Sequence, residues 1–222
     1  MLELITDRTQ ADVDRLKYLM SRGWDNLTAD EKGEYLYGYE IPMIDENNEQ
    51  FEDISGELLT MREGIQRGAY NCTDLNRVEA AVAYIAAELV QADEDLHDYA
   101  ENLDIAWDSL FNVPYNPQDY ENIVIKTDWK EPEDNEPPWA DPVEIARYYS
   151  NLELIASAFP VSTSIPDSMS GLDYNGANAI ERMLIEEHEA LAVEVERIKL
   201  LIKGTLGIFY AGELYSGEMG DT

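Results

Sequence analysis

The chain has 222 residues, of which 45% are hydrophobic and 10% aromatic, enough apolar material for one large or two small cores. Its net charge of −32 at pH 7, from 47 acidic and 15 basic residues, opposes binding to nucleic acid and to anionic membrane surfaces. No apolar run is long enough to span a membrane, and a single cysteine excludes an internal disulfide and a thiolate zinc cluster.

Residues 1–66 predict an N-terminal helical region. The hydroxyl cap of Thr9 favours a helix over residues 10–22, and a second, shorter helix is expected over residues 29–37. Residues 39–66 are polar and acidic without a clear period, which predicts an irregular excursion or an insertion.

Residues 67–203 predict the main helical region, which opens with RGAYNCTDLNRVEAAVAYIAAELV. A turn and the cap Thr73 precede a helix over residues 74–91, whose apolar side chains recur at three- and four-residue steps. The opening has an echo, because YNCTDLNRVE and YNGANAIE both place Tyr-Asn and then Asn-x-Val/Ile-Glu at a helix start. The echo indicates a shared way of starting a helix, and no fixed period elsewhere indicates a repeat protein.

An acidic, proline-containing insertion follows over residues 91–141. It predicts a long ordered loop, with a helical continuation near residues 96–110 and a strand in NIVIKTDW, residues 122–129. The density of carboxylates leaves open whether a calcium ion binds in this segment.

Two further helices complete the expected bundle. Asp141 as N-cap and Pro142 at the first helical position predict a helix that ends before Pro160, with Tyr149 on its apolar face. The last helix is expected over residues 175–203, with a heptad-like seam that packs either within the bundle or along an oligomer axis. The seam residues are Leu184, His188, Leu191, Val195, Ile198 and Ile202.

The tail, residues 204–222, alternates weakly between apolar and polar residues and predicts one or two short strands. The predicted fold is therefore mainly α, a helical bundle of about five helices with a few short β-strands and a long acidic loop region.

The sequence offers little for catalysis or for metal binding. Glu94 and His97 give one Glu-x-x-His motif of a di-iron site, but Ile185 stands three residues before His188, so the second motif is absent. Cys72 stands at a helix start, where a thiol is activated, yet no histidine is near it in sequence. We therefore expect no catalytic residue, no metal ligand and no cofactor.

Tyrosine and tryptophan residues gather at or beside the predicted loops. Such aromatics serve protein contacts or sugar stacking, and they also pin irregular loops to a helical core. The candidates for stacking on a ligand are Trp129, Trp139 and Tyr115. The abundance of acids makes some carboxylate pair inevitable, so a glycan hydrolase stays open without a specific pair to support it.

Five blocks of sequence stand out. They are TDRT and GWDNLT within residues 6–36, GAYNCTDLNRV within residues 68–89, KTDW with Pro132, LDYNGANAIE at residues 172–181, and YAGELYSGE at residues 210–218. Together the blocks resemble a module found in tail-fibre, baseplate and other minor structural proteins of phages and prophages of Gram-positive gut bacteria.

The resemblance implies a non-enzymatic virion protein of the phage tail, in the baseplate, tail tip or fibre. It further implies a homo-oligomer, a trimer or hexamer, in contact with other phage tail proteins. The alternative is a carbohydrate-binding module for a host cell-surface glycan, and the third hypothesis is a cell-wall glycan hydrolase. The chain departs from the family where Cys72 replaces an aromatic residue and where the acidic segment 91–141 is long.

Overall fold

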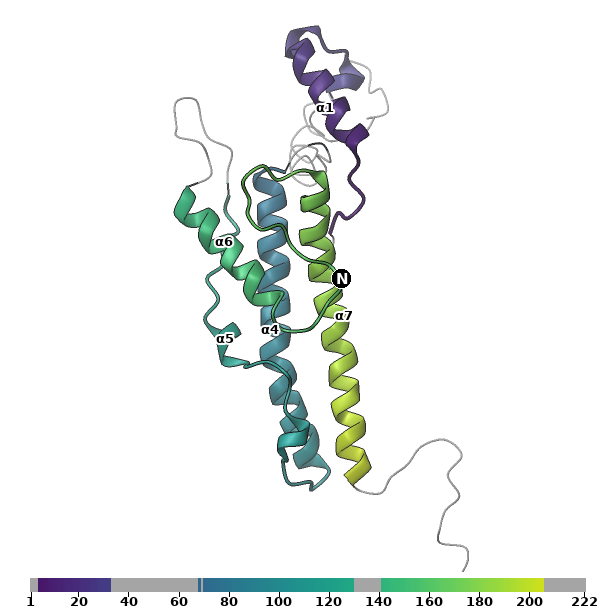
Figure 1. The fold of residues 1–222 in the computed structure, drawn as a ribbon, viewed down its shortest axis with the longest axis vertical. Helices are drawn as coiled ribbons and strands as arrows, with labels where there is room; N and C mark the ends of the chain where they lie inside the picture. The colour runs from purple at the N-terminus through teal and green to yellow at the C-terminus, as the bar shows by residue number, and fades with distance from the viewer. Residues whose placement is uncertain (1–3, 33–67, 69, 130–140, 206–222) are drawn as a thin grey trace, which may run out of the picture.

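The computed structural model describes residues 4–32, 68, 70–129 and 141–205, the coloured ribbon of Figure 1. The helices are α1 (Gln10–Arg22), α4 (Cys72–Asn102), α5 (Gln118–Glu121), α6 (Pro142–Ile155) and α7 (Tyr174–Thr205), with 3-10 turns η1 (Trp24–Asn26) and η2 (Ser109–Phe111). These described residues contain no strand, so the mainly helical prediction is confirmed in its coarse form. None of the described helices is both long and apolar enough to cross a membrane.

The core of the molecule lies between α4 and α7, two long helices that run side by side (Figure 1). α4 begins at a double cap, because the side chain of Asn71 accepts hydrogen bonds from the N–H groups of Thr73 and Asp74 while the Asp74 carboxylate accepts one from the N–H of Asn71. Both helices bury one apolar stripe in the shared interface.

The predicted end of α4 at Gln91 is wrong, since the helix continues to Asn102. Ala92, Leu96 and Ala100 extend the buried stripe, and the acids between them are exposed or half-buried. Acidic composition therefore marked the outer face of a helix here, and the predicted loop begins about three turns later.

α6 lies across this pair and begins where the sequence predicts, with the Asp141 side chain accepting from the N–H of Val143 and Pro142 in the first turn. Its buried face carries Tyr148, and the predicted Tyr149 is only half-buried.

Residues 123–129 do not form the predicted strand. Two side chains of α6, Arg147 through Nη1 and Asn151 through Nδ2, donate to the main-chain carbonyl of Val124 at 2.6 and 2.8 Å. In a β-sheet this carbonyl would instead accept from a neighbouring strand. The segment is therefore held as an irregular connection.

The heptad-like seam of α7 packs inside the chain. Leu184, Leu191, Ile198 and Ile202 are buried in the interface with α4, and the rest of the seam, His188 and Val195, is half-buried. The seam is thus the intramolecular face of α7 and leaves no free apolar surface for an oligomer axis.

α7 runs through Gly204 to Thr205, so residues 204 and 205 are helical and do not belong to a β tail. Residues 29–32 are helical as predicted. The remainder of that helix, the excursion over residues 39–66 and the predicted strands beyond residue 205 lie outside the described residues.

α1 has its predicted bounds and the Thr9 capping box, and it extends beyond the α4–α7 pair in Figure 1. It passes very close to Gly68, where an added Cβ would lie 2.5 Å from the carbonyl oxygen of Asp12 and 2.7 Å from Cβ of Leu16. Glycine at this position therefore permits α1 to contact the start of the GAYN block.

We predict that Gly68→Ala lowers the free energy of unfolding by about 1–3 kcal/mol, because the methyl group meets the backbone of α1. Urea unfolding followed by circular dichroism measures this change. Gly204→Ala is the matched control, since nothing lies within 4 Å of its added Cβ. An equal effect at both positions would contradict the proposed contact.

Candidate functional site

Four charged side chains form a buried network between the N-terminal segment, α4 and α7. Arg8 is 3% exposed, and its Nη2 lies 2.7 Å from Asp74 Oδ1 and 2.6 Å from Glu181 Oε1. Arg77 joins the same two carboxylates, with its Nη2 at 2.9 Å from Glu181 Oε1 and in contact with Asp74. Two guanidinium groups and two carboxylates balance in charge, which makes their burial possible.

The electrostatics of the network follow from this balance. Burial alone would lower the pKa of Arg77, but the hydrogen bond and charge of Glu181, with the charge of Asp74, raise it above its ordinary value. Loss of one partner would leave an uncompensated buried charge, which usually costs more than the pair contributes.

Asn178 holds the backbone of the N-terminal segment beside the network. The N–H of Arg8 donates to Asn178 Oδ1 at 3.0 Å, and Asn178 Nδ2 donates to the carbonyl of Arg8 at 2.8 Å. The N–H of Ile5 also donates to Glu181. One turn of α7 thus binds both the main chain and the side chain of residue 8.

α4 repeats this arrangement with another segment. The N–H of Trp129 donates to Asn76 Oδ1 at 2.9 Å, and Asn76 Nδ2 donates to the carbonyl of Trp129 at 3.0 Å. Three residues after Asn76, Glu79 binds Arg147 of α6 at 2.5 and 3.2 Å. We call Asn76 with Glu79, and Asn178 with Glu181, the two Asn–Glu clamps.

The two clamps receive similar segments. Thr6-Asp7-Arg8 enters the α7 clamp, and Thr127-Asp128-Trp129 enters the α4 clamp. The clamp residues Asn178 and Glu181 of α7 lie 102 positions after Asn76 and Glu79 of α4. Asp173 lies 102 positions after Asn71 in the same way. Asp173 accepts a hydrogen bond from the N–H of Gly176 at the start of α7, as Asn71 accepts hydrogen bonds at the start of α4.

The correspondence extends along both helices. Every buried residue of α7 has a buried counterpart 102 positions earlier in α4. The similarity seen between the two helix starts therefore continues along both helices, which bury corresponding positions. Each half receives its incoming segment from the other half of the chain.

A tyrosine pair and an indole fill the space between the clamps. The hydroxyls of Tyr70 and Tyr148 are 2.6 Å apart, and burial raises the pKa of both phenols. The ring of Trp129 meets that of Tyr148 edge to face and lies near Arg147. The centre of the molecule is thus a continuous polar and aromatic layer within the helix pair.

This layer accounts for the predicted stacking residues. Trp129 is 4% exposed, and the half-buried Tyr115 donates its hydroxyl to the carbonyl of Leu89 and packs its ring on Tyr120 and Phe159. Both aromatics pin loops to the core, and the buried Trp129 has no exposed face for a sugar. Trp139 lies outside the described residues.

The other candidate groups have structural roles. Cys72 is buried at the first turn of α4. His97 stacks on Trp107 with ring centroids 3.6 Å apart, and His188 lies beside Tyr84. Within the described ranges, no three or more His, Cys, Asp or Glu side chains are placed to hold a metal ion.

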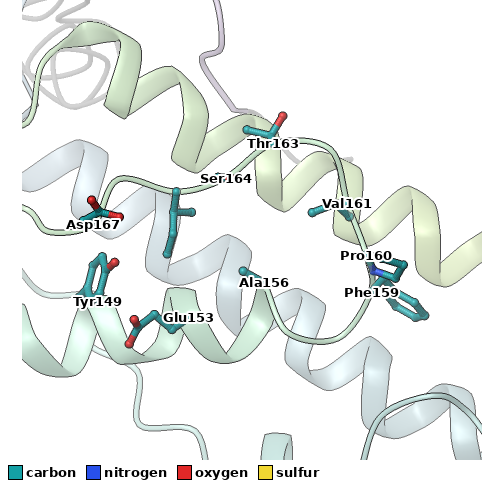
Figure 2. Close-up of a pocket in the computed structure, with 10 residues that line it drawn as sticks. Tyr149, Glu153, Ala156, Phe159, Pro160, Val161, Thr163, Ser164 and Asp167 are labelled. Atoms are coloured by element: carbon teal, nitrogen blue, oxygen red, sulfur yellow. The ribbon is translucent and has the colours of Figure 1, made fainter.

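An open groove of about 490 Å³ lies between α6 and the connection that leads to α7 (Figure 2). Tyr149 and Glu153 come from α6 and Asp167 from the connection. Tyr149 donates its hydroxyl to the carbonyl of Pro166 at 2.7 Å, and burial, Glu153 and Asp167 raise the pKa of its phenol. Sequence reasoning missed this groove, because its walls come from a helix and a loop that carry no motif.

No family model, curated protein or solved structure matched this chain.

We predict that Asn76→Ala and Asn178→Ala each lower the free energy of unfolding by about 1–3 kcal/mol, because each leaves a main-chain donor and acceptor without a partner. Urea unfolding measures both. Asn175→Ala is the control, since its side chain is exposed and bonds only to Asp173 at 3.4 Å. The clamps would lose their assigned role if all three variants were equally stable.

For the buried network, Glu181→Gln should lower the free energy of unfolding by about 3–5 kcal/mol, because Arg8 and Arg77 lose their shared counter-charge. Glu196→Gln removes an exposed ion pair with Lys199 and should change stability by less than about 0.5 kcal/mol. Thermal unfolding at equal pH and salt compares them. A loss at Glu181 no larger than at Glu196 would exclude a structural role for the network.

Proposed function

We propose that this chain is a non-enzymatic structural module of a phage tail and that it acts through protein contacts in an oligomer. The observation that carries this proposal is where the resembling blocks lie. TDRT supplies Arg8, GAYNCTDLNRV supplies Asn76 and Arg77, KTDW supplies Trp129, and LDYNGANAIE supplies the second clamp. Four separate blocks therefore build one buried layer.

A buried layer of this kind specifies a shape and offers nothing to a substrate. Its carboxylates and asparagines bind the two arginines and the main chain, and Nε of Arg8 is the one guanidinium nitrogen of the described network that is buried without a partner. The features that mark the resemblance are thus those that fix how two helical halves pack. This supports a part of an assembly better than it supports a hydrolase.

Contacts between copies have to use surfaces other than the seam of α7. Val193 and Leu200, seven positions apart on the outer face of α7, are 70% and 56% exposed. Single exposed apolar side chains are common on protein surfaces, but two on one face of a helix make a candidate contact for another chain. In this proposal a second copy of the chain covers them. The glycan-binding alternative would need a residue other than Trp129, which is buried, and could use Tyr115 only through the exposed part of its ring.

Mass measurement in solution tests the proposal, and we expect a trimer or a hexamer. Leu200→Asp should shift the population toward the monomer, because it places a charge in the contact, while helical content stays unchanged. The control Leu110→Asp changes a side chain that is 71% exposed and lies in η2. A wild-type chain that stays monomeric and binds no phage tail protein would exclude this function.

A further inference from the structure

One side chain of the main core differs in kind from its surroundings. Glu187 is 1% exposed on the inner face of α7, at the position that corresponds to Ile85 of α4. Neither oxygen of its carboxyl group has a hydrogen-bond partner. A charged carboxylate without partners in an apolar interior is strongly disfavoured, so the closed core favours the protonated form.

The groups around Glu187 come from several elements. Burial raises the pKa of its carboxyl to about 8. The nearby main-chain N–H of Phe159, which does not reach hydrogen-bonding geometry, opposes this rise, and the charge of Glu186 adds to it. Burial raises the pKa of the Tyr120 phenol on α5, the side chain of Ser157 opposes this rise, and a charge on Glu187 would add to it. The Tyr120 hydroxyl itself donates to the carbonyl of Leu154 at 3.3 Å. α4 and α6 pack against this part of α7 with apolar residues.

The neighbouring Glu186 holds the connection between α6 and α7 in place. Its carboxylate accepts from the N–H and hydroxyl of Ser162, both at 2.9 Å, and from the N–H and hydroxyl of Thr163 at 2.9 and 2.6 Å. These bonds, led by those from Thr163, lower the pKa of Glu186. Glu186 therefore stays ionised at neutral pH while Glu187, one residue on, stays neutral.

We propose that Glu187 is a proton-dependent latch for the connection over residues 156–166. In its neutral form the connection closes over α7, and ionisation of the released carboxyl favours an open connection. The groove changes with it, because Phe159, Val161 and Thr163 belong both to this connection and to the groove wall. The device thus links the proton concentration to the shape of the groove.

The pH window follows from the two states of Glu187. A released carboxyl ionises near its ordinary pKa of 4.5, and the enclosed carboxyl keeps its proton up to about 8. Between these values opening releases one proton, so each pH unit favours the open connection by about tenfold. Below and above this window Glu187 makes the opening equilibrium no more dependent on pH, because its protonation is then the same in both states.

Amide hydrogen exchange between pH 5 and pH 8 tests the latch. The reporters are the amides of Ala158, Val161, Ser162 and Thr163, whose acceptors are known. Their protection factors, corrected for intrinsic exchange, should fall by about tenfold per pH unit in the wild type. In Glu187→Gln they should be independent of pH. In Glu186→Gln they should be lower throughout and keep the wild-type slope.

Amides of Val82 and Ile85 in α4 separate local opening from global unfolding. They should stay more protected than the reporters at every pH. Equal protection in α4 and in the connection would overturn the latch, as would a flat wild-type profile or an unchanged slope in Glu187→Gln. If Glu187→Gln does not fold, carbon-13 titration of the wild-type carboxyl decides, because a Glu187 pKa near 4.5 would also overturn it.

Discussion

The structure depends on the burial of two arginines with two carboxylates between α4 and α7. Ions leave water only when their charge and their hydrogen-bonding groups are both satisfied. The charges of Arg8, Asp74, Arg77 and Glu181 balance only when the N-terminal segment, the start of α4 and the start of α7 are all in place, although Nε of Arg8 keeps no hydrogen-bond partner. Apolar packing would tolerate small shifts of α4 along α7, whereas the hydrogen bonds of this network form in only one relative position of the two helices.

The clamps give α4 and α7 the same way of holding a neighbouring segment of the chain. An asparagine that binds both the N–H and the carbonyl of one residue fixes the path of a neighbouring segment of the chain. A glutamate one turn later binds an arginine. The scaffold uses this pair in both long helices with different partners, Arg8 in one and Trp129 in the other. Within this common frame, Glu187 in place of an isoleucine is a local exception in an otherwise matched core.

Local signals in the sequence predicted the helix starts well. Thr9 and Asp141 cap their helices as expected, because a cap needs only neighbouring residues. The predicted cap Thr73 of α4 is wrong, since Asn71 is the N-cap and the helix begins at Cys72. Long-range effects were harder to predict. The acids after Gln91 suggested a loop although they lie on the outer face of α4, and NIVIKTDW has strand composition although α6 side chains bind its backbone.

The site was predictable only in part. The similar sequences YNCTDLNRVE and YNGANAIE contain the residues of both clamps. The spacing between their Tyr-Asn and Asn-x-Val/Ile-Glu parts differs, so the common 102-residue register of α4 and α7 was not recognised from the sequence. Nothing local indicated that Arg8 would be buried or that Trp129 would face inward, because both depend on partners about 50 to 170 positions away. The groove beside α6 and the unpaired Glu187 likewise arise from packing.

The distance in sequence between Arg8 and Glu181, 173 positions, has a consequence for how the chain matures. Residues 5–8 leave the ribosome long before their binding place on α7 has been made. Docking of this segment is therefore a late step of folding, and α4 has to form before its charged partner on α7 is present. A nascent chain interrupted before residue 181 has Asp74 but lacks the second of the two carboxylates that neutralise Arg8 and Arg77.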